Sequence, residues 1–402
     1  MNTLHRRRLT VAATLAAAAL ALTACATTAP SADAPEAIGP NSRVALTYDG
    51  GLYVLDGTTL EVLADLPLDG FNRLNPSGDG RHALITTTEG FRALDLGTWT
   101  DADGASHTAD PELTDLVFEA EAAGHVVRHH GKTILFADGT GDTTIFDTVD
   151  LLDGTMPETE VVASEEAHHG VAIELADGTL LTTLGNADGR TGVRALDASR
   201  TEVDRNEECP SVHGEGAAAN EIAVFGCSDG VLVYDDGAFT KIQAEDTYGR
   251  TGNEYVSETS SIAVGDYNSD PDSEGYLLTE LVFTDTVAKT STVVDLPEGV
   301  SYTWRDVARG PNDEVLVLSS DGSLYQLDET TGEVTDSWSV IAPWESPLEW
   351  QDAHPALVVL GSIAYVTEPA TSQIHAIDLE TGEVVASTTL DSAPNEIAVV
   401  TG

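Results

Sequence analysis

From about residue 41 onward, the chain alternates short apolar runs rich in β-branched residues with tight turns. Residues 44–56 form one such unit, in which two apolar runs flank Asp-Gly-Gly, and residues 83–95 repeat the form around Glu-Gly. Helical periodicity is almost absent from this part of the chain. Paired apolar runs around a glycine turn predict β-hairpins. We therefore expect an all-β fold built from repeated antiparallel units.

The same unit recurs along the rest of the chain. Further copies occupy residues 134–147, 180–197, 222–234, 277–294, 315–328 and 363–378. Their spacing of about 40 to 50 residues is the period of a β-propeller blade. One four-stranded blade cannot bury both of its faces, so blades stack in a ring. We predict an eight-bladed β-propeller over residues 42–402, with seven blades as the alternative because residues 245–300 are degenerate.

The two ends of the repeat region predict how the ring closes. The first unit lacks an inner strand, and residues 395–400 form a lone apolar strand after the eighth unit. We expect this C-terminal strand to complete the first blade, which leaves no free sheet edge. Residues 365–384 resemble the YVTN-type propeller repeat, with Asp378-Leu-Glu-Thr-Gly as a turn between outer strands. This resemblance concerns the fold and not the function.

The N-terminus has the features of a bacterial export signal. Arg6, Arg7 and Arg8 precede an apolar stretch over residues 9–22, and Leu-Thr-Ala-Cys at 22–25 has the form of a lipobox. We predict a lipoprotein signal peptide over residues 1–24, with an ordinary signal peptide as the alternative. Cys25 would carry the lipid and residues 25–41, small and proline-rich, would form a flexible tether. The protein would then be exported and lipid-anchored to the outer face of the cytoplasmic membrane.

The charge of the chain excludes one class of partner. The formal net charge is −50, with 18 Lys and Arg against 68 Asp and Glu, and removal of the three arginines in the signal leaves −53. Nucleic acid binding is excluded on electrostatic grounds, and unspecific adsorption to anionic lipid is disfavoured. The acidic composition is typical of a soluble or salt-adapted surface, and it would also attract cations. We expect a monomer.

Two cysteines remain besides Cys25. Cys209 and Cys227 form a pair in a chain predicted to be exported, which favours a disulfide. A thiolate metal site is the alternative.

Three histidines share one position in their repeats. His125, His213 and His354 each lie nine residues before the isoleucine that opens the next apolar run. That position corresponds to the start of the innermost strand, near one mouth of the central channel. Side chains at this register approach a common axis from different blades, so we expect them to converge.

The other repeats vary at this register. Asp306 stands there in one blade, nine residues before Val315. His168 and His169 precede Leu180 by twelve and eleven residues, so they fall outside the strict register. We expect this pair to lie further out on the same mouth or in the preceding loop.

Converging imidazoles indicate a transition-metal site. Zn²⁺ takes about four ligands from His, Cys and carboxylates, whereas Cu(I) prefers Met and Cys and Ca²⁺ prefers oxygen. We predict a Zn²⁺ site in which His125 and His213 are joined by a third imidazole from His168 or His169. The candidate ligands are His125, His168, His169, His213, His354, Glu215 and Asp306. Glu215 could instead orient an imidazole, and zinc affinity should fall as the pH drops through the imidazole range.

Enzymatic motifs are absent from the sequence. The chain has no Gly-x-Ser-x-Gly elbow, His-Glu-x-x-His helix or Walker loop. We therefore expect a protein that is not an enzyme. Two alternatives stay open: a propeller enzyme, such as a metal-dependent lactonase or a quinoprotein-like oxidoreductase, and a metal-free interaction scaffold. Trp304 and Trp350 are the aromatic residues near the predicted channel mouth that such an oxidoreductase could use.

Several segments together resemble the AztD-type zinc metallochaperones, which are exported propellers. They are Gly124-His-Val-Val-Arg-His-His-Gly131 with Ala137-Asp-Gly-Thr-Gly141, Ala167-His-His-Gly170 with Leu175-Ala-Asp-Gly178, and Cys209-Pro-Ser-Val-His-Gly-Glu215 with Phe225-Gly-Cys-Ser-Asp-Gly230. The resemblance extends over residues 40–402. It implies zinc binding on the propeller and delivery to the zinc-binding solute-binding protein of an ABC transporter.

The resemblance also concerns individual residues. It implies His125, His168 or His169, and His213 as ligands, with a Cys209–Cys227 disulfide next to the site. Some members of the family have a flexible N-terminal stretch rich in His and Asp. Residues 26–40 of this chain contain no His, so a role of such a stretch in metal transfer is not implied here.

Overall fold

The computed structural model describes residues 41–101, 103–273 and 276–402. The predicted signal peptide, Cys25 and nearly all of the tether lie outside the described residues. None of the helices in the described ranges is both long enough and apolar enough to cross a membrane.

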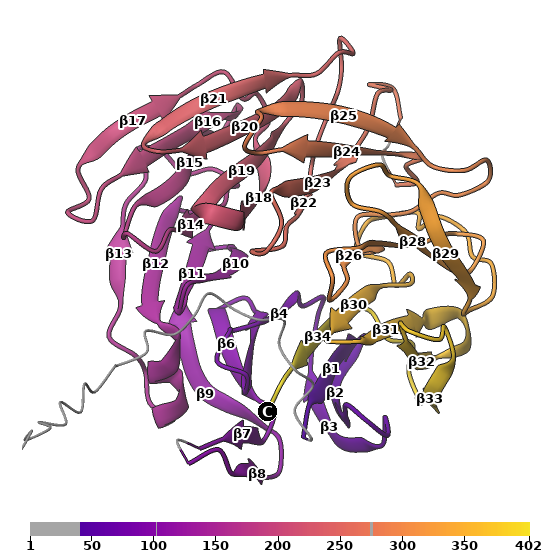
Figure 1. Ribbon diagram of the computed structural model, residues 1–402. Coiled ribbons are helices and arrows are strands. Elements are labelled where there is room, and N and C mark those ends of the chain that lie inside the picture. The colour runs from indigo at the N-terminus through magenta and orange to yellow at the C-terminus, as the bar shows by residue number, and fades with distance from the viewer. Residues whose placement is uncertain (1–40, 102, 274–275) are drawn as a thin grey trace, which may run out of the picture. The chain divides into compact units, whose positions relative to one another are not determined.

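Eight four-stranded antiparallel sheets stand in a ring around one axis (Figure 1). The prediction of an all-β propeller with eight blades is confirmed. The first four blades are β1 (Arg43–Tyr48), β2 (Gly50–Asp56), β3 (Val62–Leu68) and β34 (Ile397–Val400); β4 (Leu74–Pro76), β5 (His82–Thr86), β6 (Gly90–Asp95) and β9 (Glu112–Glu119); β10 (Ala123–His129), β11 (Lys132–Ala137), β12 (Asp142–Asp147) and β13 (Glu160–Val162); and β14 (Ala172–Glu174), β15 (Leu180–Asn186), β16 (Gly189–Leu196) and β17 (Glu202–Asn206).

The second half of the ring has the same construction. Its blades are β18 (His213–Ala218), β19 (Ile222–Cys227), β20 (Gly230–Asp235) and β21 (Ala238–Gln243); β22 (Glu254–Tyr255), β23 (Ile262–Tyr267), β24 (Glu280–Asp285) and β25 (Thr290–Asp295); β26 (Val307–Arg309), β27 (Val315–Leu318), β28 (Ser323–Leu327) and β29 (Val334–Ser339); and β30 (Leu357–Leu360), β31 (Ile363–Glu368), β32 (Gln373–Asp378) and β33 (Val384–Thr389). A hairpin of β7 (Thr98–Thr100) and β8 (Ser106–Thr108) is inserted in blade 2. The sixth blade explains the degenerate stretch of sequence, because its inner strand β22 has only two residues.

The C-terminal strand closes the ring. β34 pairs antiparallel with β1, with Ala398 opposite Ala45, and so supplies the innermost strand of blade 1. The predicted closure is confirmed. Each end of the chain contributes strands to one sheet, so the ring has no unpaired seam.

The hydrophobic core is divided among the interfaces between blades. Eight clusters of buried residues were found in the described ranges, and each contains side chains from two neighbouring blades. Alternate residues of one strand serve opposite neighbours: Leu46 packs toward blade 8 and Ala45 toward blade 2. Because side chains alternate across a strand, a strand buried on both faces must be apolar at consecutive positions. This explains the uninterrupted apolar runs of the sequence.

A recurring turn joins the two outer strands of several blades. Asp378 Oδ1 accepts hydrogen bonds from the backbone N–H groups of Glu380 and Thr381 and from the Thr381 hydroxyl. Asp56 and Asp328 make the same set of contacts in blades 1 and 7. The side-chain oxygen satisfies donors that the turn leaves unpaired. The prediction that Asp378-Leu-Glu-Thr-Gly forms this turn is confirmed.

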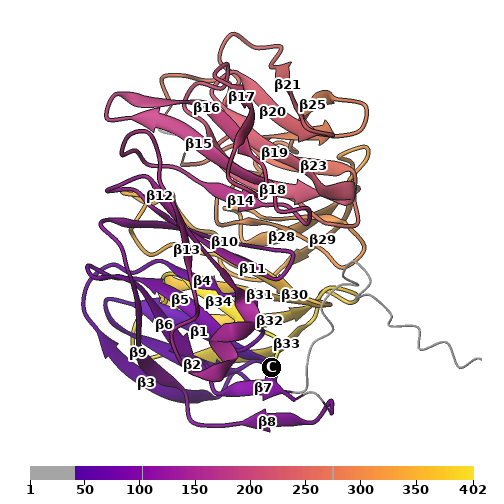
Figure 2. The same ribbon diagram turned by 90° about the vertical axis from the view of Figure 1, so that its left-hand side faces the viewer.

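The inner strands carry the histidines. β10, β14 and β18 belong to consecutive blades and contact one another in sequence around the axis (Figures 1 and 2). Residues that begin these strands, or immediately precede them, therefore lie at one end of the ring axis.

Candidate metal centre

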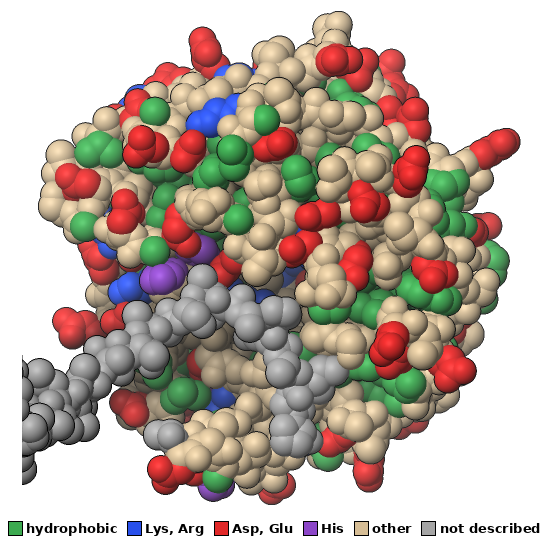
Figure 3. All heavy atoms as spheres, viewed as in Figure 1, with side chains coloured by type: hydrophobic (Ala, Val, Ile, Leu, Met, Phe, Trp, Pro, Cys, Tyr) green, Lys and Arg blue, Asp and Glu red, His purple; other side chains and the backbone are tan. Residues whose placement is uncertain are grey.

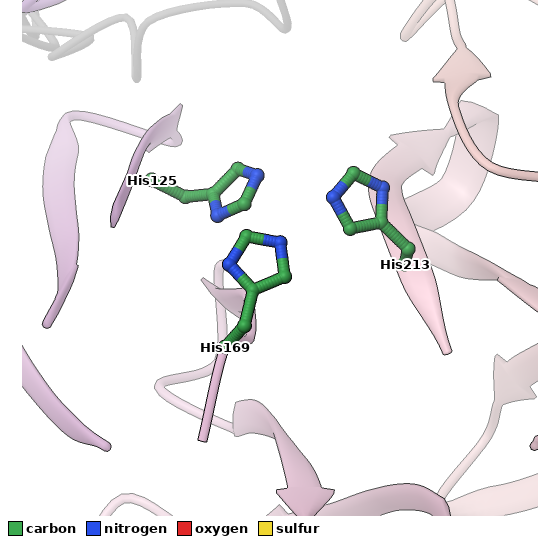
Figure 4. Close-up of side chains that lie close together, drawn as sticks. All are labelled: His125, His169 and His213. Atoms are coloured by element: carbon green, nitrogen blue, oxygen red, sulfur yellow. The ribbon is translucent and has the colours of Figure 1, made fainter. Parts of the chain in front are cut away.

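Three histidines from three consecutive blades converge on one point (Figure 4). His125 lies in β10, His169 lies in the loop before β14, and His213 begins β18. Each offers a ligand nitrogen, and these nitrogens all lie within 4.8 Å of one another. The ring centroids are 5.0 Å apart for His125 and His169 and 5.2 Å apart for the other two pairs. We call these residues the three-histidine group.

Acceptors outside the group determine which nitrogen of two rings faces it. His169 Nδ1 lies 2.6 Å from Asp138 Oδ2, and His213 Nδ1 contacts the carbonyl oxygen of Gly252. A carbonyl oxygen accepts only, and an ionised carboxylate likewise, so Nδ1 of each ring donates. Nε2 of His169 and of His213 then carries a lone pair for a metal.

His125 is held differently. Its Nδ1 is buried and makes no hydrogen bond of normal geometry among the described residues, and the Gly170 backbone acts on this ring. Figure 4 shows its other ring nitrogen, Nε2, turned toward His169 and His213. This orientation agrees with a ligand role for His125 through Nε2.

The surroundings keep two of the imidazoles neutral. Burial, together with the charges of His169, Arg190 and Arg250, lowers the pKa of His213 to about 3, although the Gly252 hydrogen bond acts in the opposite direction. Burial, followed by the charges of His213 and His169, places the pKa of His125 well below its ordinary value. Metal binding requires neutral imidazole. These two rings are therefore ready to bind without releasing a proton, at a lower pH than the sequence alone suggested.

The donor set agrees with zinc. Zn–N bonds of about 2.0–2.1 Å in a tetrahedron place ligand nitrogens about 3.4 Å apart. Small side-chain rotations would bring three nitrogens from within 4.8 Å to that spacing. Three imidazoles leave one coordination position open, as in sites where the metal must exchange a ligand.

A bulge and a disulfide position His213. The pairing of β18 with β19 shifts between His213 and Glu215, and Gly214 has φ +70° at that point. A Cβ on Gly214 would lie 2.8 Å from Asn253 Cα, so only glycine fits this turn. Cys209 and Cys227 form a disulfide, and Cys227 adjoins Gly226, the partner of His213 across the ladder. The predicted disulfide is confirmed and holds the chain that enters β18.

His168 points away from its neighbour His169. Its Nδ1 lies 2.8 Å from the Glu166 carbonyl, and its Nε2 lies 3.1 Å from the carbonyl and the hydroxyl of Thr183. Both ring nitrogens are thus occupied in a buried site. The structure therefore brings His169, and not His168, into the three-histidine group.

His354 is also outside this group. Its Nδ1 lies 2.7 Å from the Asp352 carbonyl, and its ring lies beside Trp344. Burial and the charge of Arg305 lower its pKa to about 4. The shared register with His125 and His213 therefore does not bring His354 to the same point, because blade 8 lies elsewhere around the ring.

Of the two predicted carboxylates, Asp306 is buried and Glu215 is partly buried. Asp306 Oδ2 accepts from the backbone N–H and the hydroxyl of Thr303, each at 2.7 Å, and burial raises the pKa of this residue to about 8. Burial raises the pKa of Glu215 to about 8 as well. In the described part of the chain, neither residue is among those that could share one metal ion with the three histidines. Their assignment as ligands stays a prediction.

Asp138 is the residue that the ligand prediction did not include. It follows β11, and its Oδ2 is the acceptor for His169 Nδ1. The sequence held one signal, since Ala137-Asp-Gly is part of the segment that resembles the AztD-type proteins. An Asp-Gly turn is so common in this chain that spacing alone could not single it out.

His129 forms a separate contact further along β10. Its Nδ1 lies 3.1 Å from Glu258 Oε1, and its Nε2 lies 3.0 Å from Glu221 Oε2. These two contacts outweigh burial and raise the pKa of His129. A ring held between two carboxylates cross-links blades, so His129 is not part of the three-histidine group.

Known proteins are similar to this chain in sequence and in fold. The zinc chaperone AztD of Citrobacter koseri is 24% identical over 330 residues, which are 79% of this chain and 74% of that protein. Two solved structures of AztD from the same organism match with a TM-score of 0.75 at 21% identity, over 89% of this chain and 97% of theirs. The chain matches no family model. The resemblance to AztD-type proteins is confirmed.

A more distant structure shares the ring alone. The dihydro-heme d1 dehydrogenase NirN matches with a TM-score of 0.59 at 12% identity, over 90% of this chain and 75% of that one. Such a likeness concerns the fold only. The relative with the higher sequence identity is named a chaperone, in agreement with the expectation that this protein is not an enzyme.

Proposed function

We propose that this protein is a zinc chaperone that binds Zn²⁺ through His125, His169 and His213. The observation that carries the proposal is the convergence of three imidazoles from three blades, two of them with Nδ1 fixed as donor. The name of the AztD relative supports the choice of zinc. In this proposal the metal is cargo and no reaction is catalysed.

The acceptor in this proposal is the zinc-binding solute-binding protein of an ABC transporter. Transfer proceeds by ligand exchange, in which the acceptor replaces one imidazole at a time. His169 is exposed, whereas His125 and His213 are partly buried. We therefore expect the acceptor to replace His169 first, because an incoming ligand can reach this exposed side chain without moving other parts of the propeller.

The place of action in this proposal is outside the cytoplasm. The lipobox at Cys25 would anchor the mature chain to the outer face of the membrane, and the tether over residues 25–41 would let the propeller reach a neighbouring transporter. The disulfide supports an oxidising compartment, because such bonds rarely persist in a reducing cytosol.

Zinc titration of residues 25–402 tests the binding site. The His125→Ala, His169→Ala and His213→Ala variants should each lose the tight site, measured by competition with a chromogenic chelator. His107→Ala is the matched control, since it removes an exposed imidazole from β8. Unchanged zinc affinity in all three variants would refute the assignment.

Transfer needs a separate test. Zinc-loaded protein is mixed with the metal-free solute-binding protein, and zinc in each is measured after separation. We expect faster transfer than from a small chelator of equal affinity, because ligand exchange avoids free Zn²⁺. Equal rates would argue for release into solution and against a chaperone.

A further inference from the structure

Two arginines flank the three-histidine group. The carbonyl of Arg190 accepts a hydrogen bond from the backbone N–H of Ser211, two residues before His213. Arg250 lies two residues before Gly252, whose carbonyl contacts the His213 ring. The charges of both arginines act on His213. Figure 3 shows histidines at the edge of the central hollow, with basic side chains close by on a surface where acidic ones prevail.

Neither guanidinium group has a partner among the residues that the structure describes. No hydrogen bond or ion pair of either side chain occurs within the described ranges, and both residues are half-buried. Seven other arginines, such as Arg81 with Asp95, are paired with carboxylates, whereas Arg43 and Arg128 likewise have no ion pair within the described ranges. In a chain with 68 acidic and 18 basic residues, carboxylates are abundant. Two arginines without an ion pair, whose charges act on each other and on His213, are therefore suited to bind an anion from outside.

The neighbouring carboxylates are already engaged. Asp138 attracts Arg190, but its Oδ2 accepts from His169. Asp266 attracts Arg250, but its oxygens accept from the backbone of Gly252 and from Asn253. Burial and the repulsion of Arg250 lower the pKa of Arg190. The two positive charges thus act on each other, and the neighbouring carboxylates attract them without forming an ion pair within the described ranges.

We propose that Arg190 and Arg250 bind a carboxylate that occupies the fourth coordination position of the metal. This inference rests on the proposed function, since it needs a metal at the three-histidine group. Two guanidinium groups can hold one carboxylate by charge-assisted hydrogen bonds. The same charges repel a bare Zn²⁺ ion, whereas a bound carboxylate neutralises them. Metal and carboxylate therefore favour each other's binding, and this coupling is reciprocal.

A carboxylate site between the two arginines defines how the metal passes to the acceptor. An acidic side chain of the acceptor that enters between the arginines would become the fourth ligand while the three imidazoles still hold the metal. A free small carboxylate could occupy the same position before the acceptor arrives. Departure of the carboxylate leaves the metal between two positive charges, which weakens its binding.

Cobalt substitution tests the coupling. Co²⁺ replaces Zn²⁺ and reports its coordination number through visible absorption. The wild type and the Arg190→Gln/Arg250→Gln double variant are titrated with acetate and with the peptide acetyl-Gly-Asp-Gly-amide, whose only carboxylate is the side chain, in buffer free of other carboxylates. Arg205→Gln is the matched control, because it removes one positive charge from the outer strand β17 of the same blade as Arg190. Thermal unfolding verifies that each variant is folded.

We expect a saturable change of the cobalt spectrum with either carboxylate in the wild type and in Arg205→Gln. The double variant should need at least about tenfold more carboxylate, as expected for the loss of hydrogen bonds to charged groups. Without carboxylate, the double variant should bind zinc more tightly than the wild type, because the repulsion is gone. Tighter binding of the peptide than of acetate would indicate a protein side chain as the source, and equal binding a free anion.

Two results would overturn the proposal. A cobalt spectrum that does not respond to either carboxylate would show that the fourth position is filled from within the chain, for example by Asp138. An equal response in the wild type and the double variant would show that the arginines are not involved. In both cases cobalt is still bound, so the proposed function survives. Absence of cobalt and zinc binding by the wild type would refute the proposed function itself.

Discussion

At the scale of single residues, the orientation of the imidazoles matters as much as their position. Asp138 and the Gly252 carbonyl fix Nδ1 of His169 and of His213 as donors. A ring without such an acceptor could present either nitrogen, and it would lose rotational freedom on binding. The acceptors therefore belong to the proposed metal centre even though they need not touch a metal ion.

We predict that Asp138→Asn weakens zinc binding by about 10- to 100-fold, the usual effect of removing a partner of a liganding histidine. Competition titration measures the affinity. Asp142→Asn, a nearby change of the same charge in β12, should leave it unchanged. Equal affinities in the wild type and in both variants would show that the contact does not position His169.

Asp306 should make stability depend on pH. Burial raises its pKa to about 8, from an ordinary value of 3.8. Between these values the folded protein keeps a proton that the unfolded chain has lost. The free energy of unfolding therefore falls as the pH rises from about 4 to 8.

Asp306→Asn is neutral at every pH and removes this dependence. Relative to the wild type, the variant should gain roughly 1–3 kcal/mol between pH 5 and pH 8. Denaturant unfolding at several pH values measures the difference. The exposed Asp336→Asn change should show no such gain. Parallel curves for the wild type and Asp306→Asn would contradict a protonated, buried Asp306.

At the scale of elements, irregularities of the inner strands place the histidines. The ladders of β10 and β18 shift register at Ala123/His125 and at His213/Glu215, respectively. A bulge redirects the side chains beside it. The disulfide then ties the segment before β18 to β19.

Replacing both Cys209 and Cys227 by Ser should destabilise the fold by about 3 kcal/mol, because the bond closes a short loop in the unfolded chain. Zinc affinity should fall as well, since Cys227 adjoins the ladder partner of His213. Unfolding and titration with and without reductant measure both effects. Reductant should change the wild type and leave the double variant unaffected, and a wild type insensitive to complete reduction would contradict the prediction.

At the scale of the whole molecule, the ring holds the three-histidine group together. The three histidines come from three separate sheets, and each interface between blades has its own apolar cluster. The centre therefore depends on the relative placement of rigid blades. Opening the ring anywhere should loosen that placement.

Removal of residues 395–402 should open the ring, because it deletes β34, the inner strand of blade 1. Val399 and Val400 are buried in two different clusters, so we expect a loss of more than about 3 kcal/mol. Small-angle scattering and thermal unfolding measure opening and stability. Removal of Thr401 and Gly402 alone keeps the strand and should cost much less. A compact, equally stable protein after the longer deletion would contradict closure by β34.

Local chemistry allowed much of the fold to be predicted from the sequence. Apolar runs and turn residues act within a few positions, so the blade period, the Asp378 turn and the closing strand followed from them. Compartment and residue type also favoured the disulfide. The short strand β22 obscured one blade, because two residues carry no periodicity.

The candidate ligands were only partly separable in the sequence. The register identified His125 and His213 but also His354, since it marks a place within a blade and not a direction around the ring. His168 and His169 are adjacent in the chain yet differ in partner, which depends on Thr183 and Asp138 from other segments. The sequence by itself thus determined the repeats, their arrangement in a ring and the set of candidate histidine ligands. Only the tertiary structure decided which of them meet, because convergence depends on contacts between residues far apart in the chain.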